Sequence, residues 1–260
     1  MTPGQAYEAF LVPALFRPWA EAVLKLHPPR VGTHVLDVAC GTGIAGRLAA
    51  RIVGPGGRVV GLDFDDGMLA VARDAARSSE DAPIEWRQGD AQRMPFDAAT
   101  FDYVVCLEGV QFFPSRLTGL REIRRVLRPG GHLVASVWGP LRANPAYEAL
   151  AEGLRTFVSE AAARLPPFTL SDADEIRSAV VAAGFDRVGV RAETLTFSVP
   201  SAAAFVEWIA AGGPTIRRNL AQLPEGRRAD FSRLIAQRLE RYRTAGGLAL
   251  PSGRHIVVAG

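Results

Sequence analysis

The sequence predicts an α/β fold in which helices alternate with the strands of a parallel sheet. Between residues 35 and 137, short apolar runs alternate with amphipathic segments, which is the pattern of repeated βαβ units. The first apolar run leads into a glycine-rich turn at residues 40–43, and a helical pattern follows it directly. Hydrophobic residues make up 48% of the 260 residues, which is ample for a core of this size.

Five apolar runs predict the strands of this sheet, and each is followed within two residues by glycine or an acidic residue. They lie at residues 35–39, 58–63, 84–88, 103–107 and 132–137. Apolar residues at helical spacing predict helices between them, at residues 44–53, 67–77 and 116–127. Gly130 and Gly131 are expected to end the last helix and to turn the chain into the fifth strand.

The second half of the chain is less regular and mostly helical. Helices are predicted at residues 146–163 and between a capping-box-like segment at 171–174 and Gly184, and strands at 187–197 and 253–258. Apolar residues at helical spacing predict a helical insertion between these two strands. We therefore divide the chain into an N-terminal helical cap (1–30), a core (31–198 and 248–260) and a helical lid (199–247).

The charge pattern does not point to a nucleic-acid partner. The net charge is only +3 despite a pI near 9.2, and the basic residues are arginines scattered along the chain, with Lys25 the single lysine. No apolar run approaches the roughly 20 residues that span a bilayer, and residues 1–10 lack the basic stretch of a secretory signal. We expect a cytoplasmic protein that does not insert into membranes.

Two cysteines, Cys40 and Cys106, are too few for a metal cage or a disulfide framework, so we expect no metal site. Both end apolar segments and are expected to be reduced, buried, small hydrophobic residues. The alternative is a reactive Cys40 thiol, because Cys40 precedes a helix N-terminus.

Polar residues follow successive predicted strands. Asp37 comes near the end of the first strand, Asp63 ends the second, Asp90 follows the third and Glu108 follows the fourth. The carboxyl ends of parallel strands meet at one edge of a sheet, where such folds bind their ligands. The structural alternative is that each acid caps the helix after it.

The chemistry of these residues suits a ligand that carries an adenosine-like ribose. Asp63 can accept hydrogen bonds from two ribose hydroxyls, because an ionised carboxylate is a pure acceptor. Phe64 or Met68 can lie on an adenine face. Asp90 can accept a hydrogen bond from the exocyclic amine, and the N–H of Ala91 can donate one to a ring nitrogen.

The glycine turn by itself also fits a dinucleotide site. Gly41, Gly43 and Gly46 satisfy that fingerprint literally, and Asp63 suits a nicotinamide dinucleotide. However, that fingerprint has no need of the acid Asp37, and the lone Lys25 lies upstream of the whole fold, which is a poor match to a catalytic Tyr-Lys pair.

Several motifs together resemble one family. Residues 35–43 resemble its first motif, 59–63 the second, 89–91 the third, 101–105 with 112–114 the fourth, and 127–131 the turn before its fifth strand. On these motifs the chain resembles the class I S-adenosylmethionine-dependent methyltransferases. The likeness is to the small-molecule type related to the ubiquinone and menaquinone biosynthesis enzymes (methyltransferase type 11 domain). It covers about residues 35–138 and is weaker beyond them.

The resemblance implies a Rossmann-like, seven-stranded sheet in the order 3-2-1-4-5-7-6, with strand 7 antiparallel, helices on both faces and a helical lid. It also implies S-adenosylmethionine as the cofactor. The residues that it assigns to cofactor binding are Asp37, Ala39, Gly41, Thr42, Gly43, Asp63, Phe64, Met68, Gly89, Asp90, Ala91, Leu107, Glu108 and Tyr7. Ala39 stands where the family often has glycine, a variation that close relatives share.

Glu108 stands where relatives more often have a neutral polar residue. It is our candidate catalytic residue, because an acid beside the sulfonium can stabilise its charge or act as a base toward the acceptor. The alternative is a carboxylate that faces solvent or the cofactor amine.

The predicted activity is transfer of a methyl group to an O, N or C nucleophile of a small, mostly apolar metabolite. Aromatic residues of the loops and lid are expected to form its pocket, namely Phe16, Phe112, Phe113, Trp138, Phe168, Phe205 and Trp208. The alternatives are a non-methylating reaction of an S-adenosylmethionine-binding protein and, less favoured, an NAD(P)-dependent oxidoreductase. The sequence leaves the oligomeric state open, with a homodimer among the options.

Overall fold

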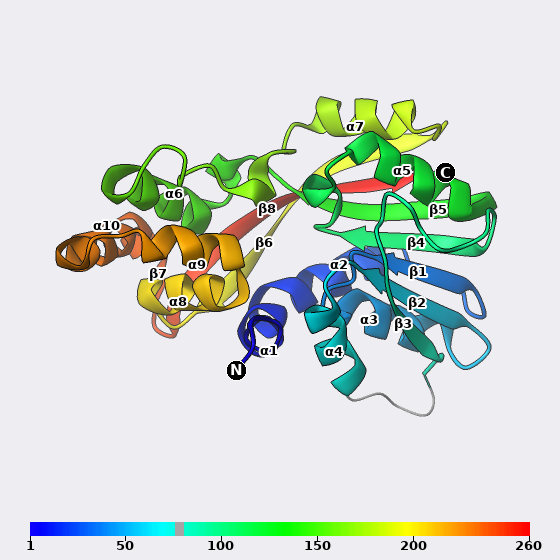
Figure 1. The fold of residues 1–260 in the computed structure, drawn as a ribbon, viewed down its shortest axis with the longest axis horizontal. Coiled ribbons are helices and arrows are strands. Elements are labelled where there is room, and N and C mark those ends of the chain that lie inside the picture. Colours follow the sequence, from blue (N-terminus) through cyan, green and yellow to red (C-terminus); the bar gives the residue numbers. More distant parts are fainter. Residues whose placement is uncertain (76–80) are drawn as a thin grey trace.

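The predicted βαβ units form most of one eight-stranded sheet (Figure 1). The structure is a computed structural model that describes residues 1–75 and 81–260. The strand order is β3-β2-β1-β4-β5-β8-β6, with β7 paired to β8, and β8 runs antiparallel to β5 and β6. The strands are β1 His34–Val38, β2 Arg58–Asp63, β3 Ile84–Gln88, β4 Phe101–Leu107, β5 Leu127–Trp138, β6 Val188–Val199, β7 Arg243–Thr244 and β8 Gly247–Ala259. The predicted order and antiparallel last strand are confirmed, and the short β7 is an addition.

The helices fall into three groups along the chain. An N-terminal helical segment comprises α1 Pro3–Ala6, the π-helix η1 Tyr7–Phe16 and α2 Arg17–Leu26. The central helices are α3 Ile44–Val53, α4 Asp66–Asp74, α5 Arg116–Val126, α6 Pro145–Phe157 and α7 Ala173–Ala182. Those between β6 and β8 are α8 Ala202–Gly212, α9 Pro214–Ala221 and α10 Arg228–Leu239. Short 3-10 turns include η2 Val110–Phe112 after β4.

Most predicted elements lie within two residues of the observed ones, and the differences have local causes. The predicted helix 116–127 ends at Val126, because Leu127 pairs with Phe101 and so already belongs to β5. The predicted helix 67–77 begins one residue earlier and ends at Asp74, and its last two predicted positions lie outside the described residues. The predicted helix 146–163 ends six residues early, at Phe157.

Alternate residues of the central strands supply two cores, one on each face of the sheet. On β1, Val35 joins the core shared with α2 and α3, whereas Leu36 and Val38 join the core shared with α5 and α7. The helices accordingly cover both faces (Figure 1). The carboxyl ends of β1 to β5 are therefore held at one edge of a sheet that is packed on both sides.

The largest departure from prediction is the length of β8, which begins at Gly247 rather than at 253. β5 pairs with β8 only as far as Trp138↔Arg254, whereas β6 pairs with it down to Val199↔Leu248. Residues 247–253 therefore continue with β6 as a ribbon beyond β5 (Figure 1). Leu248 and Leu250 pack with the helices at its end, so this ribbon carries the helices between β6 and β8.

Candidate active site

The glycine turn after β1 is shaped by one aromatic ring. The indole of Trp86, on β3, lies so close that a Cβ atom would come within 2.2 Å of it at Gly43 and within 2.3 Å at Gly61. Gly43 also has a φ of +83°, a left-handed conformation that favours glycine. Gly46 packs between Trp86 and the Asp37 carboxylate. These glycines therefore serve close packing of strand, turn and helix.

Asp37 is buried beneath this turn with 1% of its surface exposed, and its Oδ2 accepts a hydrogen bond of 2.7 Å from the N–H of Gly46. Burial raises the pKa of Asp37 to about 7, while the Gly46 hydrogen bond opposes the shift. The Asp63 charge raises it further, and Arg47 lowers it. The carboxyl thus anchors the first turn of α3 and holds its proton to unusually high pH.

We expect this proton to appear in the pH dependence of stability. The carboxyl of an unfolded chain titrates near pH 4, so the folded protein binds the proton more tightly, and stability is lost as the pH rises from about 4 to 7. Relative to Asp37→Asn, the wild type should lose up to about 4 kcal/mol of unfolding free energy over this range. Urea unfolding from pH 4 to 8 measures it. Asp66→Asn, at an exposed position, is the control, and a pH-independent difference between wild type and Asp37→Asn would contradict the prediction.

Asp63 lies at the end of β2 directly beside the glycine turn. Its Oδ2 accepts a 2.7 Å hydrogen bond from the N–H of Gly41, and its Oδ1 accepts one of 2.9 Å from the N–H of Asp65. Burial raises its pKa, and these backbone hydrogen bonds oppose the shift. Met68 reaches the same turn, with its Cε 3.4 Å from where a Cβ of Gly41 would lie. The structure thus brings Gly41, Asp63 and Met68 together.

The other predicted adenine-side residues are more open. Phe64 is 77% exposed and covers nothing. Asp90 is exposed, and its Oδ1 accepts a 2.8 Å hydrogen bond from the N–H of Gln92 in the turn that leads toward β4. Gly89 packs against Leu62, and Ala91 is half-buried. These residues lie at the predicted sheet edge, and their contact with an adenine stays a prediction.

The N-terminal helical segment is tied to the glycine turn through Arg47. Its Nη2 lies 2.7 Å from Glu8 Oε1 on η1, and its Nη1 donates to the carbonyl oxygen of Thr42 at 2.5 Å. The buried hydroxyl of Thr42 has no hydrogen-bond partner in the described part of the chain. Gly4 packs tightly against α4, with Gly67 O 3.1 Å from a Cβ placed on it. The segment thus covers the turn as the predicted cap would.

We expect Arg47→Met to weaken the packing of the N-terminal segment on the glycine turn. Removing one partner of a largely buried pair typically costs about 3–5 kcal/mol, and the value should be lower here, about 2 kcal/mol, because Glu8 retains some contact with water. Thermal unfolding measures the loss, and limited proteolysis should cut the N-terminal segment sooner. Arg51→Met, one turn further along α3 and mostly exposed, is the matched control. Equal effects of the two variants would contradict the assigned link.

Glu108 does not face solvent, because only 8% of its surface is exposed. It has a φ of +53°, and its N–H donates to the carbonyl of Ser136 at 2.9 Å. Its Oε1 accepts from the Ser136 hydroxyl and forms an ion pair with Nη1 of Arg254 on β8. The carboxylate is thus held by a buried cation, an arrangement that the sequence reading missed. The available signal was an arginine inside the predicted final strand, just before its apolar end at residues 256–258.

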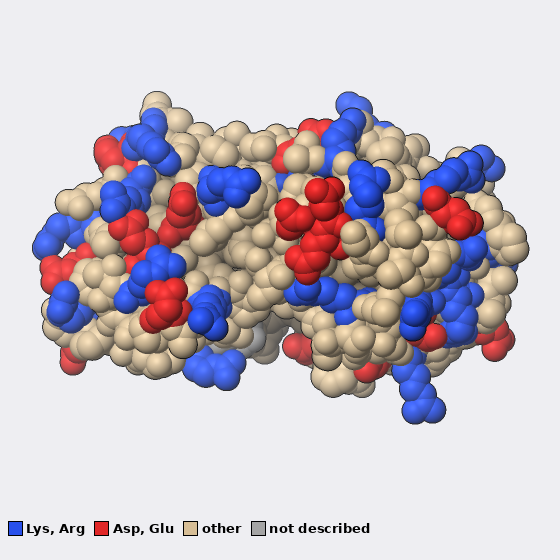
Figure 2. All heavy atoms as spheres, turned by 90° about the horizontal axis from the view of Figure 1, so that it is seen from above, with Lys and Arg blue, Asp and Glu red and all other residues tan. Residues whose placement is uncertain are grey.

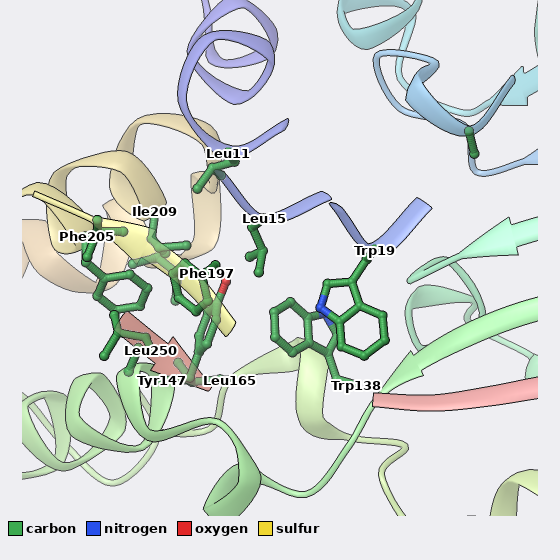
Figure 3. Packing of buried hydrophobic residues seen from close by; sticks show 14 of the residues in the cluster. Leu11, Leu15, Trp19, Trp138, Tyr147, Leu165, Phe197, Phe205, Ile209 and Leu250 are labelled. Atoms are coloured by element: carbon green, nitrogen blue, oxygen red, sulfur yellow. The ribbon is translucent and has the colours of Figure 1, made fainter. Parts of the chain in front are cut away.

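The predicted pocket residues divide into two groups. Trp138, Phe168 and Phe205 all contact Tyr147, with ring centroids 4.8 to 5.4 Å apart. Phe16 and Trp208 pack against the same core, stacked on Tyr7 and Phe10 respectively. Figure 3 shows several of these rings converging beneath the N-terminal segment.

Phe112 and Phe113 lie apart from the aromatic rings packed around Tyr147, and their assignment to the pocket stays a prediction. The chain turns through η2 after β4 and buries Val110 and Gln111. Phe112 is thereby turned outward, 53% exposed, and Phe113 packs on Gly119 of α5, in the core of the other face.

The residues at this edge fit a nucleoside with an attached amino acid. Asp63 offers carboxylate oxygens, the backbone at Gly41 is approachable, and the Thr42 hydroxyl and the Gln111 amide are buried without a partner among the described residues. Leu107 and Glu108 close the edge after β4. Among the residues that the structure describes, no three His, Cys, Asp or Glu side chains lie together in a group that could hold a metal ion.

Sequence comparison agrees with this geometry. Residues 35–131 match the family model described as a methyltransferase domain. Over these residues the chain is similar to that domain. A demethylmenaquinone methyltransferase of Listeria welshimeri is 40% identical over 115 residues, which are 44% of this chain and 49% of that protein. The chain therefore matches about half the length of this relative, and the methyltransferase domain resembles the quinone methyltransferases.

Solved structures show the same fold over nearly the whole chain. The YcgJ protein from Bacillus subtilis has a TM-score of 0.58 at 19% identity, covering 92% of this chain and 96% of its own. The cyclase SpnF has a TM-score of 0.53 at 18% identity, covering 94% and 80%. The fold thus extends beyond the matched domain.

In the described residues no helix is long and apolar enough to span a bilayer.

Proposed function

We propose that this protein transfers a methyl group from S-adenosylmethionine to an O, N or C nucleophile of a small, mostly apolar molecule. One observation carries the proposal, namely the glycine turn packed beside Asp63 at the carboxyl edge of a sheet in methyltransferase order. The relative at 40% identity supports it over the matched segment.

Different residues would bind different parts of the cofactor. Asp63 would bind the ribose hydroxyls, Asp90 and Ala91 the adenine, and the turn from Asp37 to Gly43 the methionine part, with Tyr7 closing over it. When bound, S-adenosylmethionine supplies an activated methyl group. The aromatic cluster would orient an apolar acceptor and exclude water from it, and positioning of this kind can supply much of the rate enhancement.

Glu108 is a weaker candidate for the base than its position in the sequence suggested. One oxygen already accepts from Ser136 and pairs with Arg254, and the side chain is buried. A carboxylate held in this way favours positioning or charge compensation over proton abstraction.

The fold alone does not decide the reaction, because a cyclase shares it. Isothermal titration with S-adenosylmethionine, S-adenosylhomocysteine and NADH tests the cofactor, and mass spectrometry of candidate acceptors tests for a gain of one methyl group. We expect both adenosyl compounds to bind and NADH not to bind. Binding of NADH alone would contradict the proposal, and cofactor binding with a product of unchanged mass would favour a non-methylating reaction.

We also propose the division into an N-terminal helical cap (1–30), a core (31–198 and 248–260) and a helical lid (199–247), together with a cytoplasmic location and no nucleic-acid partner. Basic and acidic side chains are interspersed over the face seen in Figure 2, which supports the last point. A homodimer remains an option that sedimentation analysis would test.

A further inference from the structure

Arg254 is an unusually placed cation. It lies on β8 opposite Trp138 and is 1% exposed. Its Cζ lies 4.1 Å from the ring centroid of Trp138, 4.9 Å from that of Trp19 and 5.5 Å from that of Phe16. Burying a guanidinium costs several kcal/mol, which three rings and one carboxylate offset only in part.

The hydrogen-bond donors around Arg254 lack acceptors. Among the described residues, none of its three nitrogens makes a hydrogen bond of good geometry, although Nη1 touches Glu108, and the indole N–H of Trp19 is also unpartnered. Tyr7 and Tyr147 contribute two hydroxyls nearby, since Tyr7 stacks on Phe16 and Tyr147 contacts Trp138, two rings that also flank Arg254. Figure 3 shows the Tyr147 hydroxyl pointing away from α6 toward Leu15 on the N-terminal segment.

Both tyrosines lie within electrostatic reach of this cation. Burial raises the pKa of each phenol, Glu108 raises it further, and Arg254 lowers it. Phe16 lies between Tyr7 and Arg254, and Trp138 between Tyr147 and Arg254, so these three groups flank one place that is lined by aromatic rings and contains the Glu108 carboxylate. Buried donors nearly always have partners in native proteins, so the missing partner is an acceptor from outside the chain.

We infer that Arg254, with Tyr147, binds an anionic oxygen of the methyl acceptor. The acceptor is therefore an apolar acid, a carboxylate or a phenolate, and this inference rests on the proposed function. The place suits an acceptor because Glu108 follows β4 and Trp138 ends β5, at the same edge as the cofactor residues. Phe16 and Trp19 belong to the N-terminal segment, so entry requires that segment to move.

Three small aromatic probes test the inference in the whole protein, with and without S-adenosylhomocysteine. The probes are 2-naphthoate, 2-naphthol and the neutral ester methyl 2-naphthoate, with Kd from titration calorimetry. We expect 2-naphthoate to bind at least tenfold more tightly than the ester. Preference for 2-naphthol over both that strengthens as the pH rises toward the pKa of the naphthol would assign the phenolate instead. Equal binding of all three, or binding of none, would overturn the inference.

Three variants test which residues cause the preference for 2-naphthoate over its methyl ester. Glu108→Gln/Arg254→Met removes both charges together and should bring the acid-to-ester ratio to about one, with folding checked by circular dichroism. Tyr147→Phe removes only a hydroxyl and should lower the ratio at least threefold. Arg241→Met, which removes an exposed arginine stacked on Tyr242, should leave it unchanged.

The outcomes separate this inference from the proposed function. An unchanged ratio in the folded double variant overturns the inference, and if that variant does not fold, an unchanged ratio in Tyr147→Phe does so. Failure of the wild type to bind S-adenosylhomocysteine would contradict the proposed function, while the probe preference measured without cofactor would still report on the anion site.

Discussion

Asp63→Ala is expected to weaken the binding of S-adenosylmethionine at least 100-fold. The variant would lose two charge-assisted hydrogen bonds to the ribose, each worth about 1.5–3 kcal/mol, and 1.4 kcal/mol corresponds to a tenfold change in affinity. It would also release the N–H of Gly41, which the carboxylate holds at 2.7 Å. Titration calorimetry measures the change in Kd.

Two further variants make this experiment specific. Asp66→Ala removes a nearby exposed carboxylate that pairs with Arg73, so its Kd should match the wild type. Asp63→Asn keeps the side-chain volume and one acceptor oxygen, so it should lie between wild type and Asp63→Ala. Wild-type affinity in Asp63→Ala would refute the ribose role.

Gly43→Ala is expected to lower the free energy of unfolding by about 3 kcal/mol. The left-handed φ of +83° costs an alanine about 1 kcal/mol, and overpacking costs a further 1–3 kcal/mol because the new Cβ would lie 2.2 Å from the Trp86 ring. Urea unfolding gives the value directly. The S-adenosylhomocysteine Kd should rise as well, since the turn must shift.

Gly32→Ala separates the two causes. Gly32 has a similar φ of +78° but no atom within 4 Å of its added Cβ, so it should cost only about 1 kcal/mol. In the double variant Gly43→Ala/Trp86→Leu the overpacking should be relieved, which gives a favourable interaction energy in a double-mutant cycle. Strictly additive losses would show that Trp86 does not constrain the turn.

Local patterns explain why the strands of the parallel sheet were predictable. β2 and β3 have the predicted bounds. β2 is a buried apolar run that begins after Gly57 and ends in Asp63, whereas β3 is an edge strand whose bounds are marked by Pro83 before it and Gly89 after it. The first six residues of β8 were missed because residues 247–252 contain a glycine and a proline, which are typical of loops, and their pairing with β6 is a long-range contact.

In the candidate site, too, local features could be predicted from the sequence and long-range contacts could not. The sequence identified Asp37, Asp63 and Glu108, because acids at strand ends stand out against apolar runs. It could not place Arg254, which is 146 positions away from Glu108 in the chain and reaches it only because β8 inserts beside β5. It also assigned Phe112 to a pocket, although the turn after β4 directs that side chain outward.

The sequence alone determined the short motifs that resemble the family, and that resemblance implied the sheet order and S-adenosylmethionine as the cofactor. The tertiary structure decided what the acids do. It paired Glu108 with a buried arginine, linked Glu8 to the glycine turn through Arg47 and closed aromatic rings around Arg254. These contacts join distant segments, and their strength depends on burial, which lowers the local dielectric and which no local pattern specifies.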